Sequence, residues 1–182
     1  MKPTVTIATS LLAMAMALTN HAANNYEPQR NDFSFVSHTC TSFDEGDLLL
    51  DSIITFVIDK NGPVYAITSE TLPLDVNLWT GFGEIAEEDI NFDGIPDLQI
   101  CLGPTNAYGG FTYDGYVWDN VLHRFTQVEN FDKIMDPYYD SSKRRITGTY
   151  RVDDDLYYSV YEWRDNKLVL IEESTDHISA DE

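Results

Sequence analysis

The sequence has few cysteines, histidines and basic residues, and each shortage excludes a class of protein. Its 182 residues include two Cys and four His, without the His-rich spacing of a transition-metal site. Eleven Lys and Arg stand against 31 Asp and Glu, giving a formal charge of −20. A chain this acidic does not bind nucleic acid through the phosphates. It attracts metal cations and cationic proteins instead.

Motifs of catalysis are also missing. The sequence has no nucleophile elbow and no phosphate-binding loop, and His38, His123 and His177 are scattered among strand and turn residues. We therefore expect that the protein is not an enzyme.

The sequence has one long apolar run, and it lies near the amino terminus. Lys2 precedes the run 7–18, and Ala22-Ala23 stand before polar residues. This pattern predicts a signal peptide over residues 1–23, followed by a flexible linker at 24–32. The run is too short for a comfortable transmembrane helix, so we expect a soluble periplasmic protein with no membrane span after processing. A retained membrane anchor is the alternative.

Export bears on the two cysteines, Cys40 and Cys101, because both remain after signal removal. In an oxidising compartment a pair of cysteines favours a disulfide. The alternative is that Cys101, within an apolar strand, is a small buried hydrophobic residue.

Short β-branched and aromatic segments separated by turns predict an all-β domain over residues 33–175, with an acidic tail at 176–182. About eight short strands at regular spacing indicate an antiparallel β-sandwich or barrel. Asn61-Gly62 marks one hairpin turn. The only segment that suits a short helix is 131–139.

A calcium-loop pattern occupies residues 89–97. Oxygen-bearing side chains stand at its first, third, fifth and ninth places, with Gly94 at the sixth for the sharp turn. The predicted calcium ligands are Asp89, Asn91, Asp93, the backbone carbonyl of Ile95, and Asp97.

The loop departs from an EF-hand because Ile100 stands where a bidentate Glu belongs and a strand follows. Glu87, Glu88, Asp114 or Asp119 would have to complete the shell. The alternative is an Asx turn whose side chains bind their own backbone.

From Asp89 to about Glu173 the chain resembles a known family. The shared features are the Asp-x-Asn-x-Asp-Gly-x-x-Asp loop, Gly109-Gly110, the segment Tyr113–Asp119, Phe125 and the Tyr-rich segment Tyr157–Trp163. They resemble calcium-binding periplasmic immunity proteins that neutralise lysozyme-like toxins of a bacterium-killing type IV secretion system. The fold of those proteins is similar to that of periplasmic inhibitors of invertebrate-type lysozyme. The resemblance implies inhibition of a lysozyme-like peptidoglycan hydrolase.

A basic segment fits such a role. Lys143, Arg144, Arg145 and Arg151 lie within nine positions around Thr147-Gly148-Thr149-Tyr150, which is similar to the short Ser-Gly-x-Tyr loop of bacterial lysozyme inhibitors. Hydroxyl and guanidinium donors suit the paired carboxylates of a glycosidase cleft. The predicted partner-binding residues are Tyr108, Arg144, Arg145, Thr147, Thr149 and Tyr150. The alternative is local pairing of these cations with nearby Asp residues.

Two functions from different classes remain open. The first is a periplasmic inhibitor or immunity protein whose partner is a lysozyme-like, cationic peptidoglycan hydrolase. The second is a calcium-stabilised surface or adhesion module of the integrin-repeat type, with no enzyme target. The single Asp-rich loop favours the first, because propeller-type modules repeat that loop.

Overall fold

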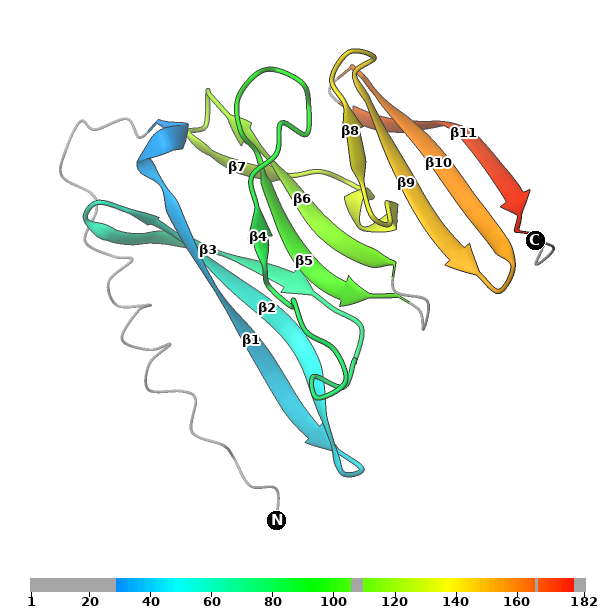
Figure 1. The fold of residues 1–182 in the computed structure, drawn as a ribbon. Coiled ribbons are helices and arrows are strands. Elements are labelled where there is room, and N and C mark those ends of the chain that lie inside the picture. The colour runs from blue at the N-terminus through cyan, green and yellow to red at the C-terminus, as the bar shows by residue number, and fades with distance from the viewer. Residues whose placement is uncertain (1–28, 106–109, 166, 179–182) are drawn as a thin grey trace.

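The computed structural model describes residues 29–105, 110–165 and 167–178, and it is built almost entirely of antiparallel strands. The predicted all-β class is confirmed. The described strands form three sheets and no closed barrel (Figure 1). No helix in the described residues is long and apolar enough to cross a membrane. The predicted signal peptide lies outside the described residues.

The first sheet comes from the amino-terminal part of the chain, in the order β1-β2-β3. Its strands are β1 (Ser34–Asp44), β2 (Asp47–Asp59) and β3 (Gly62–Glu70). The predicted β2–β3 hairpin is present, but its two turn residues are Lys60-Asn61, one place earlier than expected, and Gly62 starts β3 with φ +124°. A second hairpin, β1–β2, turns tightly at Glu45-Gly46.

The second sheet has the order β4-β5-β6-β7. Its strands are β4 (Ile85–Ala86), β5 (Leu98–Pro104), β6 (Phe111–Asp119) and β7 (Arg124–Gln127). The candidate calcium loop is the connection from β4 to β5.

The third sheet has the order β11-β10-β9-β8. Its strands are β8 (Tyr138–Asp140), β9 (Arg145–Val152), β10 (Asp155–Arg164) and β11 (Lys167–His177). The segment 131–139, which suited a short helix, forms a single 3₁₀ turn, η2 (Phe131–Lys133), and then β8. The last strand also runs into the expected tail, because β11 pairs with β10 along its whole length.

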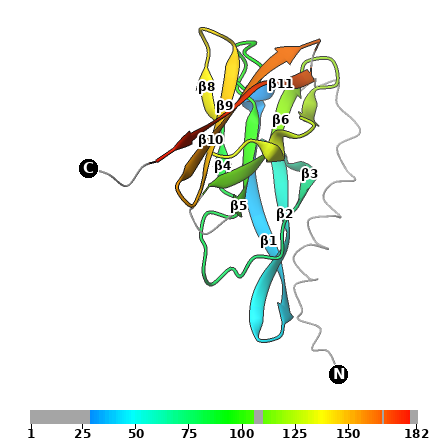
Figure 2. The same cartoon turned by 90° about the vertical axis from the view of Figure 1, so that its right-hand side faces the viewer.

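The second sheet is the middle layer, with a hydrophobic core on each face (Figures 1 and 2). Trp118 and Phe125 pack against the first sheet, with their ring centroids 5.2 Å apart. Val117 and Val128 face the other way, toward Ile146 of the third sheet. Alternation of side chains along β6 explains how one strand serves both cores.

Gly115 of β6 is required by the second core, because a Cβ there would lie 2.5 Å from the ring of Phe131, which is 1% exposed. We expect Gly115→Ala to force Phe131 to move and to lower the free energy of unfolding by about 1–3 kcal/mol. Gly110→Ala is the matched control, because its Cβ would meet neighbours only at 3.6 Å or more. Urea denaturation measures both variants, and equal stabilities would contradict this packing.

Candidate functional site

The loop 89–97 folds around its first side chain. One carboxylate oxygen of Asp89 accepts the backbone N–H of Asp93 and the other accepts that of Gly94, each at 2.9 Å. Gly94 takes φ +88°, the left-handed conformation that the sequence pattern requires at this place. The predicted sharp turn is therefore present.

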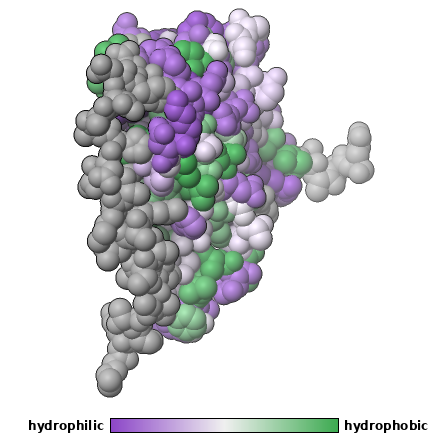
Figure 3. All heavy atoms as spheres, turned by 90° about the vertical axis from the view of Figure 1, so that its left-hand side faces the viewer, coloured by the Kyte–Doolittle hydropathy of each residue, from purple (hydrophilic) through white to green (hydrophobic). Residues whose placement is uncertain are grey.

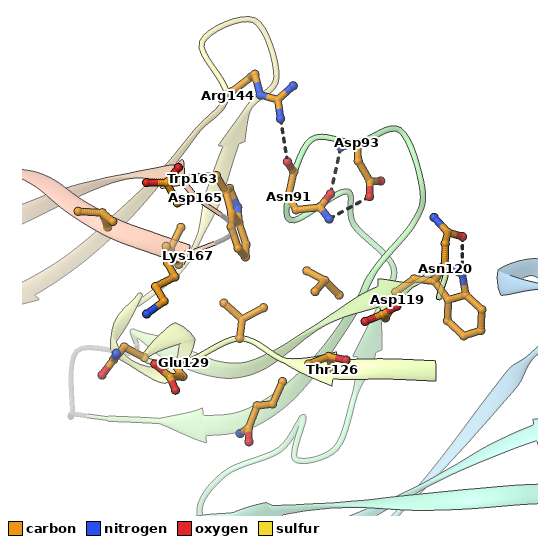
Figure 4. Close-up of a pocket in the computed structure, with 17 residues that line it drawn as sticks. Asn91, Asp93, Asp119, Asn120, Thr126, Glu129, Arg144, Trp163, Asp165 and Lys167 are labelled. Atoms are coloured by element: carbon orange, nitrogen blue, oxygen red, sulfur yellow. Dashed lines mark hydrogen bonds between the residues drawn. The ribbon is translucent and has the colours of Figure 1, made fainter. Parts of the chain in front are cut away.

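The next two polar side chains also point into the loop. The Asn91 side-chain oxygen accepts the N–H of Asp93 at 3.0 Å, and the Asn91 amide donates to the Asp93 carboxylate at 3.0 Å (Figure 4). The second Asp93 oxygen accepts the N–H of Ile95 at 2.8 Å. These bonds are the Asx turns of the alternative interpretation. They also gather three oxygen-bearing side chains that retain lone pairs, which is the donor chemistry that calcium prefers.

Asp97 has a different place from the other predicted ligands. It is fully buried, and one of its oxygens accepts the N–H groups of Ile90 (2.9 Å) and Asn91 (3.3 Å). The other accepts the N–H of Trp118 in β6 at 2.8 Å. Burial raises the pKa of Asp97 to about 7, while these three N–H donors oppose the rise. Asp97 thus joins the loop to β6 through these hydrogen bonds.

Three of the four residues proposed to complete a calcium shell, Glu87, Asp114 and Asp119, have other partners. Glu87 pairs with Arg30, and Asp119 caps the β6–β7 turn through the N–H groups of Val121 and Leu122. Asp114 is buried, accepts a bond from the Tyr116 hydroxyl, and has its pKa raised by burial. Among the described residues, no three His, Cys, Asp or Glu side chains converge closely enough to hold a metal ion. Calcium binding therefore stays a prediction that rests on the Asp89, Asn91 and Asp93 oxygens.

Arg30 fixes the outer side of the loop, although the sequence placed it in a flexible linker. Its guanidinium is buried, lies 5.2 Å and 5.0 Å from the ring centroids of Phe35 and Phe125, and ion-pairs with Glu87. Its Nε donates to the Pro96 carbonyl at 2.5 Å. This contact joins the start of the first sheet to the candidate cation loop.

A half-open cleft of about 870 Å³ lies beside the loop, between the second and third sheets (Figure 4). Asn91 and Asp93 stand on one side, and Trp163 and Lys167 stand on the other. The Trp163 indole N–H is held by the Ile90 carbonyl at 2.6 Å. The cleft therefore has one wall that is fixed to the loop.

The basic segment is divided rather than gathered into one loop. Arg145, Thr147 and Thr149 lie inside strand β9 and alternate with buried Ile146 and Gly148, so they face outward from the core. Thr-Gly-Thr-Tyr is not a loop like the Ser-Gly-x-Tyr loop that it resembles, because this run is paired with β10 along its length.

Tyr150 projects from the opposite face of β9, where it stacks on Tyr157 with ring centroids 4.7 Å apart and planes 6° apart. Most of the basic side chains form the local ion pairs of the alternative interpretation. These pairs are Lys143–Asp140 (3.3 Å), Arg145–Glu162 (2.7 Å) and Arg151–Asp154 (3.6 Å). Arg144 instead donates to the Asn91 carbonyl of the candidate calcium loop at 3.3 Å. Tyr108 lies outside the described residues.

The predicted disulfide is not formed, since Cys40 and Cys101 are both free. They belong to different sheets: Cys40 of β1 stands opposite Ser52, and Cys101 of β5 stands opposite Tyr113. Cys101 is buried, and this burial raises its pKa. It packs as a small hydrophobic residue, which is the alternative stated above.

The fold is similar to that of a solved structure. The similarity is to a protein described as a Xanthomonas type IV secretion system related protein, with a TM-score of 0.54 and 22% sequence identity. It covers 82% of this chain and 80% of the other. No protein-family model matches the chain, and no curated protein sequence matches it significantly.

Calcium should raise the melting temperature, because a ligand that binds only the folded state adds RT ln(1 + [L]/Kd) to stability. Without a twelfth-place Glu, we expect a Kd on the order of 10⁻⁴ M or weaker. Asp93→Ala should abolish the rise, and Asp132→Ala, which removes an exposed acid elsewhere, should keep it. Scanning fluorimetry with calcium and with EDTA tests this, and identical melting curves for the native protein would remove the calcium hypothesis.

Arg30→Met should lower the free energy of unfolding by about 1.5–3 kcal/mol, because Pro96 and Glu87 lose a charged hydrogen-bond donor. Glu87→Gln should cost less, since the Glu87 side chain is 50% exposed and water replaces the lost pairing. Chemical denaturation in EDTA makes the comparison without bound metal. A larger loss for Glu87→Gln than for Arg30→Met would show that Arg30 is not the anchor.

Proposed function

We propose that this chain is an exported inhibitor or immunity protein that blocks a lysozyme-like peptidoglycan hydrolase by binding it, with no catalysis of its own. The observation that carries the proposal is the structural likeness to the Xanthomonas protein. That protein's description supports an association with type IV secretion. The further step to hydrolase inhibition rests on the sequence resemblance of residues 89–173.

The structural likeness adds something that the sequence resemblance lacks. The resemblance is confined to the carboxyl half, whereas the likeness covers 82% of the chain. It therefore extends beyond the residues that carry the sequence resemblance. The proposal accordingly treats all three sheets as one binding protein.

The candidate calcium loop has a structural role in this proposal. Calcium would bind through Asp89, Asn91 and Asp93, whose side chains accept hydrogen bonds within the loop, and through the Ile95 carbonyl. It would neutralise acidic side chains that otherwise repel one another. Asp97 contributes by holding the loop against β6. Arg144, which donates to Asn91, extends the same support to the β8–β9 turn.

Contacts with the hydrolase require donors that reach an acidic catalytic cleft. Thr147 and Thr149 present hydroxyl groups on the outer face of β9, where Tyr138 is 69% exposed beside Thr147. Arg145 shares this face, although Glu162 already neutralises part of its charge. Tyr150 belongs to the other face. The two faces are separate candidate contact surfaces and are tested by separate variants.

The purified protein, with calcium present, should protect peptidoglycan from at least one member of a panel of c-type, g-type and invertebrate-type lysozymes and any hydrolase encoded beside its gene. Raising the salt concentration should slow association, because it screens attraction between an acidic protein and a cationic enzyme. Turbidity of a peptidoglycan suspension measures protection, and biolayer interferometry measures the association rate. Undiminished digestion by every enzyme, with the protein shown to be folded, would defeat the proposal.

A further inference from the structure

The β1–β2 hairpin extends beyond the rest of the first sheet. Its pairing continues to Asp44 and Asp47, whereas β3 pairs with β2 only as far as Ser52 opposite Glu70. Figures 1 and 2 show the hairpin projecting at the lower end of the molecule, away from the candidate calcium loop. The β1–β2 hairpin therefore projects from the sheet, and its end forms a separate surface.

Exposed hydrophobic side chains lie on this hairpin and on the connection that follows β3 and runs beside β2. Phe43, near the turn, is 73% exposed, and Leu72 and Leu78 of the following connection are 60% and 74% exposed. We name these three residues the apolar tip. Figure 3 shows hydrophobic and hydrophilic atoms side by side at the lower end of the described surface. Aromatic side chains are enriched at protein interfaces, so the exposed Phe43 marks this end as a contact surface.

The apolar tip is held in a fixed conformation. The connection runs along the free side of β2, where Leu50 N–H donates to Leu74 at 2.8 Å and Val76 N–H donates to Leu48 at 3.0 Å. Asp75 then caps the N–H of Asn77 at 2.8 Å. At the turn itself, Glu45 and Gly46 take φ +49° and +107°, the left-handed conformations of a tight hairpin turn. A rigid anchor loses little conformational entropy when it binds.

The acidic charge of this part of the chain indicates what kind of partner the apolar tip would bind. Residues 31–123 contain sixteen acidic residues and one basic residue, Lys60, although the whole chain has 11 basic residues. Asp44, Glu45 and Asp47 flank Phe43 at the turn. A surface with an aromatic centre and an acidic rim complements a cationic protein surface that has an apolar pocket.

We propose that the apolar tip is a docking surface for a cationic protein, with Phe43 as its central anchor. Resting on the proposed function, the inference identifies that partner as the hydrolase and places part of the interface on the amino-terminal sheet. Phe43 enters an apolar pocket, and the acidic rim pairs with basic side chains around it. None of the predicted partner-binding residues lies in this sheet.

Phe43→Ala tests the inference, with Val121→Ala as the matched control. Val121 is 85% exposed, but it lies in the β6–β7 turn at the other end of the middle sheet. Because both side chains are exposed, both variants should keep the native melting temperature. Each is assayed against the c-type, g-type and invertebrate-type lysozymes, and any hydrolase encoded beside the gene, for binding and, separately, for inhibition of peptidoglycan digestion.

We expect Phe43→Ala to weaken binding at least about tenfold, mainly by faster dissociation, and Val121→Ala to leave it unchanged. Inhibition that survives Phe43→Ala intact would overturn the docking surface and leave the proposed function standing. Binding that is lost in Phe43→Ala but never inhibits digestion would support the docking surface and overturn the proposed function. Absence of binding to every enzyme would overturn both.

Discussion

The buried carboxylate of Asp97 is the interaction on which the arrangement of this molecule depends. A carboxylate removed from water is costly unless hydrogen bonds replace its hydration. Here three backbone N–H groups replace it, two from the candidate calcium loop and one from Trp118 of the middle sheet. The same side chain therefore shapes the loop and attaches it to the strand that serves both hydrophobic cores.

The loop is secured from outside as well. Arg30, at the entrance to the first sheet, binds the loop through Pro96 and is enclosed by the rings of Phe35 and Phe125. Trp163 of the third sheet reaches the loop through the Ile90 carbonyl. One connection thus receives contacts from the second sheet, the third sheet and the segment that enters the first sheet, so its conformation and their mutual positions are linked. Cation binding there would stabilise the whole fold rather than a local segment.

This organisation separates the two ends of the molecule. The end with the loop is held together by buried polar contacts, whereas the other end carries the exposed apolar tip on an acidic hairpin. In the proposed inhibitor, the first end gives stability and the second contributes to recognition. The outer face of β9 lies on a different sheet from the apolar tip, so a hydrolase that contacts both would span two sheets.

The features that follow from local chemistry were predictable from the sequence. Gly94 required a left-handed conformation, Asn61-Gly62 required a hairpin, and alternating apolar residues required strands. Features that depend on distant partners were not predictable. Arg30 stands in a polar segment that suits a linker, and the partners that enclose it, Phe125 and Pro96, are far along the chain. The sequence carried one indication of this role. Arg30, just before Phe33 and Phe35, is the only Lys or Arg between Lys2 and Lys60.

The placement of the basic segment's side chains on two faces of β9 was not predictable from the sequence, for a similar reason. Whether Thr149 and Tyr150 share a face depends on whether their run is a loop or a strand. Pairing with β10 makes it a strand, which sends neighbouring side chains to opposite faces. The short strand β8 likewise exists because β9 lies beside it. Its own sequence suited a helix equally well.

The proposal that this chain protects a bacterium from a peptidoglycan hydrolase is tested most directly inside cells. Each lysozyme of the panel would be exported to the periplasm of a test bacterium, together with the full chain or a variant that lacks residues 1–23. We predict survival with the full chain for at least one enzyme and lysis with the truncated variant, because removal of the predicted signal peptide should keep it out of the periplasm. Equal lysis with both forms for every enzyme, when both are produced and folded, would contradict the inhibitor function.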